Sequence, residues 1–272
     1  MFDKNIILRT DRNVKGKKKN LKGVIFGCII IYSKSDRRVF VMKKQTNIKT
    51  IDFHSHILPA ADHGSDGIDT SLSQLGLLEA AGVDIVVATS HFYPQNETVD
   101  AFIERRERAA RELAAHKSDK IKIALGAEVY CMAGLENMEG LEKLTIKGTN
   151  TLLLEMPMSF WNTNVITTVF ALNERFDIVL AHIDRYPSNE LEKLLYLGIP
   201  VQVNAANILR RHNKKRLSVW LGEGIVSAVG SDLHGADKKA VKSFLKAQKL
   251  LKYDIEEIFQ KTEALIKNAE LI

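Results

Sequence analysis

Two histidines, His54 and His56, follow an apolar, strand-like run that begins at Thr50. Alternate residues of a strand share a face, so both imidazoles are expected to project together from the end of this strand. Neutral imidazole nitrogens are common ligands of metal ions. Two polar residues where a strand leaves the core would give the same pattern. The prediction of a metal site therefore depends on whether similar residues recur downstream.

Further residues that can bind metals recur at the ends of five later apolar runs. In parallel α/β folds the carboxyl ends of the strands form one rim, where active sites collect. Each residue alone could be a polar strand exit, but their gathering at one rim favours a common site. The candidate ligands are His54, His56, His63, His91, Glu128, Glu155, His182, Asp232 and His234.

These candidates are imidazoles and carboxylates without thiolates, which suits manganese, with iron or zinc as alternatives. They exceed the needs of one ion, so two or three ions are predicted. A bound metal can lower the pKa of water to ~7, and ions ~3.5–4 Å apart stabilise both oxygens in phosphoryl transfer. Phosphate-ester hydrolysis is therefore the predicted reaction. Arg185, close after His182, is placed to bind phosphate oxygens with its forked guanidinium, unless it is an ordinary surface residue.

The elements that must position these residues alternate short apolar runs with longer helical stretches. This alternation is typical of βα units wrapped around a parallel sheet or barrel. Strands are predicted at 50–54, 84–89, 121–128, 151–155, 177–182, 200–204 and 225–230. Helices are predicted at 68–82, 97–116, 164–174, 189–198, 214–222, 238–252 and 254–269.

The composition is ordinary for a globular α/β protein, with 272 residues of which 45% are hydrophobic. Cys28 and Cys131 form no C-x-x-C pair, so neither a disulfide framework nor a thiolate zinc site is indicated, and a cytoplasmic setting is expected. Residues 1–50 contain 14 Lys or Arg and 3 Asp or Glu, which leaves 25 and 30 for residues 51–272. The acidic body argues against a nucleic-acid partner.

The basic leader contains an apolar run at 24–32, which resembles the hydrophobic part of a signal peptide. The run is too short for the ~20 residues of a membrane span, so no stable membrane insertion is expected. The charged stretch Ser33–Arg38 occupies the place where small residues should form a cleavage site. We predict a leader of unknown role at 1–49, upstream of or overlapping a true start at Met42, and a catalytic domain at 50–272.

Seven motifs resemble those of the PHP (polymerase and histidinol phosphatase) superfamily, in order from about residue 50 to about 235. Within it the chain is most similar to the manganese-dependent bacterial protein-tyrosine phosphatases of capsule and exopolysaccharide gene clusters, the CpsB type. The motifs are Ile51-Asp52-Phe53-His54-Ser55-His56 with Asp62-His63-Gly64, Ala88-Thr89-Ser90-His91, Gly126-Ala127-Glu128, Leu153-Leu154-Glu155-Met156-Pro157, Ala181-His182-Ile183-Asp184-Arg185-Tyr186, Gln202-Val203-Asn204-Ala205 and Ser231-Asp232-Leu233-His234.

The resemblance implies a distorted (β/α)₇ PHP-type barrel with three metal ions at the carboxyl ends of the strands. It also implies that Arg185 binds the phosphate and that the substrate is a phosphotyrosine protein, the tyrosine kinase of polysaccharide synthesis. If the family's ligands are carried over to this chain, His54, His56, Glu128 and Asp232 bind the first ion. Glu128 also binds the second ion, together with Glu155 and His182. The third ion is bound by His63, His91 and His234.

The chain departs from the family pattern at three places. His63 stands where the family has Asp before the Gly. Ser90 and Phe92 replace a Pro and a second His beside His91. A second phosphate-binding Arg is expected shortly after His234, where Lys239 can supply charge but no fork. These changes affect the tyrosine-phosphatase assignment more than the metal site.

Alternative functions are a small-molecule phosphatase, such as one acting on histidinol phosphate, a PHP nuclease, and a non-catalytic metal-binding scaffold. The short loops after the ligand-bearing strands favour a phosphotyrosyl protein, because a small molecule needs additional walls. Aromatic residues after two strand ends could flank a phenyl ring or simply pack the loops. These are Phe92, Tyr93, Phe160 and Trp161. Assembly into a homo-oligomer is compatible with the sequence.

Overall fold

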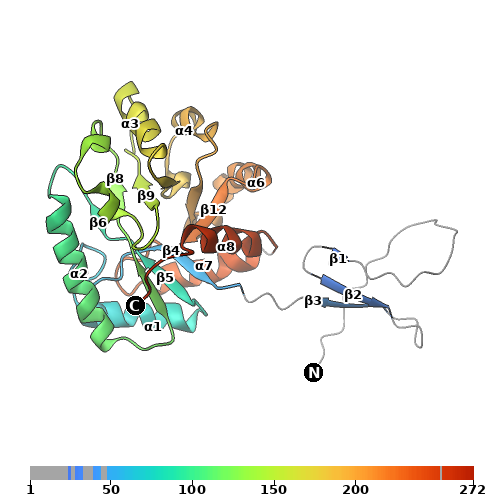
Figure 1. Cartoon of the computed structure of the whole chain (residues 1–272). Helices are drawn as coiled ribbons and strands as arrows, with labels where there is room; N and C mark the ends of the chain where they lie inside the picture. Colours follow the sequence, from blue (N-terminus) through green and yellow to red (C-terminus); the bar gives the residue numbers. More distant parts are fainter. Residues whose placement is uncertain (1–23, 26–27, 33–38, 44–47, 252) are drawn as a thin grey trace. The chain divides into compact units, whose positions relative to one another are not determined.

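A computed structural model describes residues 24–25, 28–32, 39–43, 48–251 and 253–272 of the chain (Figure 1). The chain divides into two units, Met1–Asn47 and Ile48–Ile272. In the first unit β1 (Val24–Ile25), β2 (Cys28–Tyr32) and β3 (Val39–Lys43) form an antiparallel sheet in the order β1-β2-β3. The apolar run of the leader therefore supplies two strands. Among the described residues no helix has the length and apolarity needed to cross a membrane.

The second unit is an α/β fold with parallel sheets, as the alternation of the sequence predicts. One sheet has the order β4-β5-β7 and the other has the order β12-β11-β10-β9-β8-β6. The strands are β4 (Ile51–Ser55), β5 (Ile85–Ala88), β6 (His91–Phe92), β7 (Lys122–Leu125), β8 (Glu128–Tyr130), β9 (Thr151–Glu155), β10 (Asp177–Leu180), β11 (Val201–Asn204) and β12 (Val226–Gly230).

Two of the seven predicted strands are interrupted, and each continues in the other sheet. The predicted strand at 84–89 corresponds to β5, and the chain continues past residue 89 into β6 of the other sheet. The predicted strand at 121–128 is broken into β7 and β8. The backbone N–H of Gly126 donates to Ala88 O at 2.9 Å, and that of Glu128 donates to Ser90 O at 3.0 Å. The interrupted strands therefore stay side by side, and the nine segments occupy seven strand positions.

The two sheets also meet where β12 lies beside β4. The N–H of Asp232 donates to His54 O at 2.8 Å, and Leu233 forms a parallel bridge with Ser55. Gly230 allows this approach, because a Cβ there would lie 2.5 Å from the Cβ of His54. The predicted distorted barrel is thus present as two parallel sheets that meet at this seam and at the interrupted strands.

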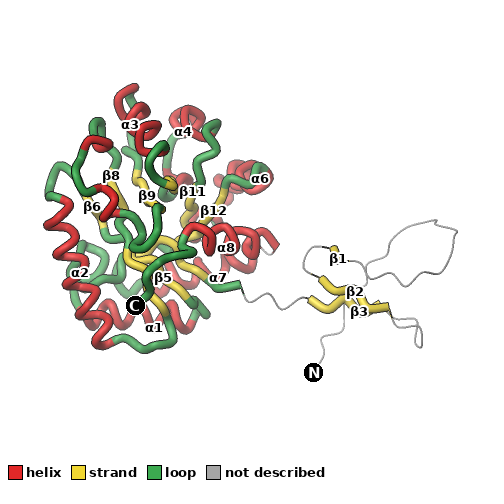
Figure 2. Tube along the Cα trace, viewed as in Figure 1, coloured by secondary structure: helices red, strands yellow, loops and turns green. Residues whose placement is uncertain are grey.

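Helices lie around the outside of the strands (Figure 2). Thr98 and Asn162 cap the N-termini of two of them by accepting hydrogen bonds from Ala101 N and Val165 N. The longer helices are α1 (Ile68–Ala80), α2 (Val99–His116), α3 (Thr163–Asn173), α4 (Ser188–Leu195), α6 (Lys214–Gly222), α7 (Lys238–Leu251) and α8 (Tyr253–Leu265), with a short α5 (Ala205–Ile208) after β11.

The core lies between the strands and these helices. Every residue of β4 and of β12 is buried. Strands covered on both faces read as continuous apolar runs rather than as alternating ones, which explains why the runs were visible in the sequence. The few polar side chains inside these strands, above all His54 and Asp52, are therefore exceptions that require partners. The carboxylate of Asp52 accepts hydrogen bonds from the N and Oγ of Ser231, at 2.7 and 2.6 Å.

Candidate metal centre

All nine predicted ligands lie in a strand or in the loop that follows one, and two of them lie where an interrupted strand resumes. His54 lies within β4, His56 directly follows it, and His63 lies in the loop between β4 and α1. His91 begins β6, Glu128 begins β8 and Glu155 ends β9. His182 follows β10, and both Asp232 and His234 follow β12.

The carboxylate of Glu128 lies at the centre of this group and is almost completely buried. Its Oε2 lies 3.0 Å from His91 Nδ1, 3.2 Å from His54 Nε2 and 3.3 Å from His56 Nε2. No hydrogen bond reaches Oε2 in the described part of the chain, although three ring nitrogens surround it. Buried polar atoms are normally satisfied, so this convergence without hydrogen bonds indicates a set of cation ligands.

A second convergence involves His54 and His56. Nε2 of His54 and Nε2 of His56 lie 3.1 Å apart. Oδ1 of Asp232 lies 3.8 Å from the first and 3.5 Å from the second. Two imidazole nitrogens and two carboxylates that face one another in this way fit a transition-metal ion.

The other ligands extend the centre along the rim in two directions. On one side His182 Nε2 lies 2.8 Å from Glu128 Oε1 and 3.5 Å from Glu155 Oε1. On the other side the ring centroid of His63 lies 4.8 Å from that of His91 and 4.7 Å from that of His234. The rim therefore holds more donors than one ion can use, as the sequence predicts.

Electrostatics makes the centre attractive to cations. Burial would raise the pKa of Glu128, but the neighbouring charge of His54 and a hydrogen bond from His182 to Oε1 hold that pKa well below its usual range. Burial also opposes ionisation of Asp232, whose pKa is nevertheless lowered by His56, His54 and Arg185. Burial would lower the pKa of His182, yet hydrogen bonds to Glu128 and Glu155 raise that pKa to about 9. The carboxylates of Glu128 and Asp232 are therefore ionised at neutral pH, and their negative charges attract cations.

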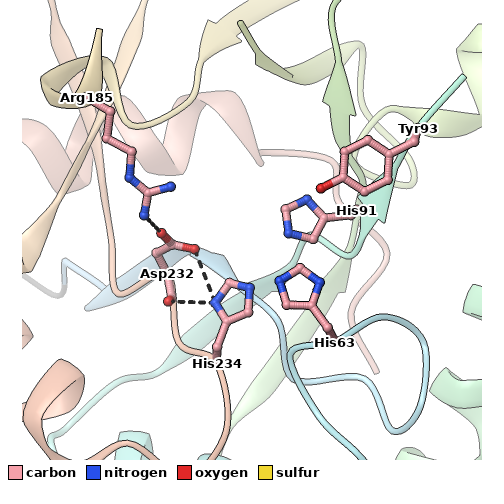
Figure 3. Close-up of a pocket in the computed structure, with 6 residues that line it drawn as sticks. All are labelled: His63, His91, Tyr93, Arg185, Asp232 and His234. Atoms are coloured by element: carbon pink, nitrogen blue, oxygen red, sulfur yellow. Dashed lines mark hydrogen bonds and ion pairs between the residues drawn. The ribbon is translucent and has the colours of Figure 1, made fainter. Parts of the chain in front are cut away.

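An open cavity of about 430 Å³ lies over the His63 side of the centre (Figure 3). Arg185, in η3 (Ile183–Arg185), lies across the cavity from His91 and donates a hydrogen bond to Oδ2 of Asp232. Tyr93 stacks on the His91 ring, with centroids 5.2 Å apart and planes inclined by 18°. The cavity thus combines metal-type donors, a guanidinium and an aromatic ring. Its lining residues are His63, His91, Tyr93, Arg185, Asp232 and His234.

The backbone is strained at two of the proposed ligands. His182 has φ 29° and Asp232 has φ 52°, both in the left-handed region that residues with a Cβ rarely adopt. Such conformations persist where the surrounding structure requires them, often at functional sites. At the loop of His63, Gly64 packs so closely that a Cβ would lie 2.0 Å from the Cβ of His56.

Residues that the sequence analysis did not assign to the site orient its histidines. Asp62 Oδ2 lies 2.8 Å from His56 Nδ1 and accepts a hydrogen bond from His91 N at 2.9 Å. Gln202 Oε1 accepts from His182 N at 2.6 Å and lies 3.2 Å from His54 Nδ1. With their Nδ1 atoms engaged, His54 and His56 direct Nε2 towards Glu128.

Asn204 extends this support to a third strand end. Its Nδ2 donates to Asp232 Oδ2 at 2.8 Å, and its Oδ1 accepts from Gln202 Nε2 at 2.9 Å. The signal in the sequence was the amide of Gln202 between the apolar residues Val201 and Val203. A polar side chain at such a position requires a buried partner.

Several other predicted residues lie away from the centre. Lys239 is exposed in the first turn of α7, outside the set of described residues that line the cavity. The prediction that Phe92 and Trp161 could flank a phenyl ring is wrong, because both side chains are buried in the core. Of the four aromatic candidates, Tyr93 lines the cavity, and Phe160 is 71% exposed with Lys193 over its ring.

We predict that His63→Ala lowers the bound metal or the catalytic activity by about an order of magnitude, because its ring lies against two other candidate ligands. His116→Ala is the matched control, since His116 is exposed at the end of α2. Metal content and turnover of the two purified variants check the prediction. Equal behaviour of both variants would exclude His63 from the site.

A parallel α/β fold with a cluster of imidazoles and carboxylates at the carboxyl ends of its strands defines the class of metal-dependent hydrolases. The family model described as "Capsular polysaccharide synthesis, CpsB/CapC" matches residues 50–272. The chain belongs to the CpsB/CapC family.

Curated relatives include the tyrosine-protein phosphatase CpsB of Streptococcus agalactiae serotype III (strain NEM316), which is 30% identical over 205 residues. This match covers 69% of the chain and 84% of the relative. CpsB of Streptococcus pneumoniae is 29% identical over 210 residues, which is 70% of the chain and 84% of the relative.

The fold is also similar to a solved structure. One chain from the crystal structures of YwqE from Bacillus subtilis and CpsB from Streptococcus pneumoniae matches with a TM-score of 0.65. Those two proteins are described as unique metal-dependent tyrosine phosphatases. The sequences are 20% identical, and the match covers 82% of this chain and 96% of the other. The α/β architecture predicted from the sequence is therefore confirmed.

Proposed function

We propose that this protein is a metal-dependent protein-tyrosine phosphatase. The observation that carries the proposal is the convergence of histidines on the buried Glu128, with Arg185 across the adjoining cavity. The curated relatives are tyrosine-protein phosphatases, which supports the same activity for this chain. A non-catalytic scaffold would not need a guanidinium beside the ligand cluster.

We assign the ligands to three ions, for which manganese is the proposed metal. The donors are imidazoles and carboxylates, and the thiol of Cys131 is free and buried elsewhere in the core. The first ion would be held by His54, His56, Glu128 and Asp232. The second would be held by Glu128, Glu155 and His182, and the third by His63, His91 and His234.

The ions would supply Lewis-acid stabilisation of the phosphate oxygens and activation of the attacking water. The protein contributes position and charge. Arg185 can bind two non-bridging phosphate oxygens at once, while its hydrogen bond to Asp232 fixes the direction of the guanidinium. Asp62 Oδ2 and Gln202 Oε1 accept hydrogen bonds from Nδ1 of His56 and His54, which keeps the Nε2 atoms of both rings directed at the reaction centre.

Phosphotyrosine fits the cavity better than a free small molecule does. The loops after β9 and β12 span only 156–162 and 231–237, so they build no walls that could enclose a ligand. A phosphorylated phenol extends ~6 Å from its backbone and can reach the centre while the attached protein stays outside. Tyr93 at the cavity edge offers a face against which the phenyl ring can stack.

The proposed substrate is a tyrosine kinase of polysaccharide synthesis, encountered in the cytoplasm. The family description, capsular polysaccharide synthesis, supports this process, and phosphotyrosine on a protein requires a kinase as the preceding enzyme. Lys239 could add charge near the phosphate, although its side chain is exposed in α7. A homo-oligomer is compatible with this function.

Substrate preference tests the proposed function. We expect the manganese-loaded protein to hydrolyse p-nitrophenyl phosphate and phosphotyrosyl peptides, with little turnover of phosphoserine peptides or histidinol phosphate. Phosphate release measured at equal substrate concentrations checks this. A higher kcat/KM for histidinol phosphate than for phosphotyrosyl peptides would contradict the tyrosine-phosphatase assignment while leaving the metal centre intact.

We also propose that the leader at 1–49 does not contribute to the active site. All nine proposed ligands lie in the second unit, and the family match begins at residue 50. A chain that starts at Met42 should therefore fold and retain most of its phosphatase activity. Soluble yield and kcat/KM measured beside the full chain test this, and loss of either would make the leader part of the catalytic domain.

A further inference from the structure

Positive charge is concentrated in two segments of an otherwise acidic body. Residues 205–222 contain five Lys or Arg and no Asp or Glu, and α7 (Lys238–Leu251) contains five Lys and no acidic residue. Residues 51–272 contain 25 basic and 30 acidic residues, so the remainder of this range has 15 basic and 30 acidic residues. Two acid-free basic segments in such a chain require a physical explanation.

Most cations of these segments are exposed and have no side-chain ion pair in the described part of the chain. Many exposed or half-buried cations outside them form ion pairs, such as Arg105 with Glu97, Lys120 with Glu79 and Lys143 with Asp100. We define the basic rim as six cations that are all exposed and have no side-chain ion pair in the described part of the chain. The basic rim comprises Arg210, Arg211, Lys214, Lys215, Lys238 and Lys239.

Both parts of the basic rim come shortly after strands that end at the catalytic centre. They follow β11 and β12, whose carboxyl ends carry Asn204 and Asp232. Arg216 Nη2 donates to Tyr186 O at 3.0 Å, one residue after Arg185, which anchors this segment beside the cavity. Asp184, one residue before Arg185, accepts from Asn204 N at 2.9 Å, and α5 packs against α7. The basic rim therefore continues the positive side of the cavity that begins at Arg185.

We propose that the basic rim binds an anionic segment next to the phosphotyrosine of the substrate protein, with acidic or further phosphorylated residues. The inference rests on the proposed function and adds a sequence preference to it. Charge complementarity carries it, because unpaired cations beside a phosphate-binding cavity attract a polyanionic chain whose phosphotyrosine enters that cavity. The acidic remainder of the unit would repel the same chain, so the peptide would approach from the β11 and β12 side.

The test compares two variants with the same change in net charge. R210E/R211E alters the basic rim, whereas K246E/K249E alters two exposed lysines later in α7. Each protein is assayed with two phosphotyrosyl peptides, one with glutamates and a second phosphotyrosine beside the target residue and one with neutral neighbours. The readout is the ratio of kcat/KM for the acidic peptide to that for the neutral peptide, which cancels effects on folding or metal loading.

We expect the unmodified protein to prefer the acidic peptide, R210E/R211E to lower the ratio by about tenfold, and K246E/K249E to leave it within about twofold. Added salt should reduce the preference of the unmodified protein, because it screens exposed charges. An equal ratio in all three proteins would overturn the proposal. The proposal would also be overturned if R210E/R211E lost binding to anionic phospholipid vesicles while the ratio stayed unchanged. That result would mean that the basic rim binds a membrane surface. Failure of the unmodified protein to hydrolyse either peptide would instead refute the proposed function.

Discussion

Glu128→Gln should reduce the hydrolysis of phosphotyrosyl peptides by at least about a hundredfold and should lower the number of metal ions bound per chain. The change keeps the size of the side chain but removes the negative charge to which His54, His56, His91 and His182 are directed. A neutral amide would also have to direct its NH₂ group at ring nitrogens or at a cation. Kinetics and elemental analysis of the purified variant provide the measurement.

The control for this substitution is Glu112→Gln, which removes an equal charge from an exposed position on α2. Thermal unfolding of both variants separates a loss of structure from a loss of metal. Normal metal content together with normal turnover in Glu128→Gln would show that the carboxylate is not a ligand. That result would also remove the main argument for a cluster of ions at the rim.

Arg185→Lys should lower kcat/KM for phosphotyrosyl peptides by about 10- to 100-fold while leaving the metal content unchanged. Lysine retains the positive charge but cannot bind two phosphate oxygens in the parallel geometry of a guanidinium. It also cannot keep the same contact with Asp232 while it faces the cavity. Steady-state kinetics with p-nitrophenyl phosphate and a phosphotyrosyl peptide, at saturating manganese, check the prediction.

Arg175→Lys is the matched control, because Arg175 is exposed and precedes β10, the strand that Arg185 follows. Its guanidinium contacts Glu136 O and the ring of Phe176. These contacts lie at the end of β10 opposite to the metal centre. A similar decrease in both variants would mean that Arg185 acts through stability. Loss of metal from Arg185→Lys alone would instead make it a residue that positions Asp232.

Most of the fold could be predicted from the sequence because strands buried on both faces appear as continuous apolar runs. Val226–Gly230 and Thr151–Glu155 lie where they were expected. The interruption between β7 and β8 could not be predicted, because 123–127 is a continuous apolar run and the break depends on pairing with two different sheets. The strands of the leader were likewise not predicted, since their apolar run also resembled a signal segment.

The candidate ligands were predictable for a different reason. Ionisable residues are rare at the ends of buried strands, so the histidines and acids there were conspicuous. Asp62 and Gln202 were not assigned roles, because their function depends on which ring nitrogen lies beside each of them. Exposure likewise decides between the aromatic residues, since Phe92 is enclosed whereas Tyr93, next in the chain, reaches the cavity.

Metal reconstitution tests the catalytic centre most directly. Protein freed of metal with a chelator is titrated with manganese, and bound metal and phosphate release from a phosphotyrosyl peptide are measured on the same samples. We predict no hydrolysis without metal and full activity when two or three ions are bound per chain. Hydrolysis of the peptide by protein that contains no metal, or the absence of hydrolysis by fully loaded protein, would contradict the metal-dependent phosphatase mechanism.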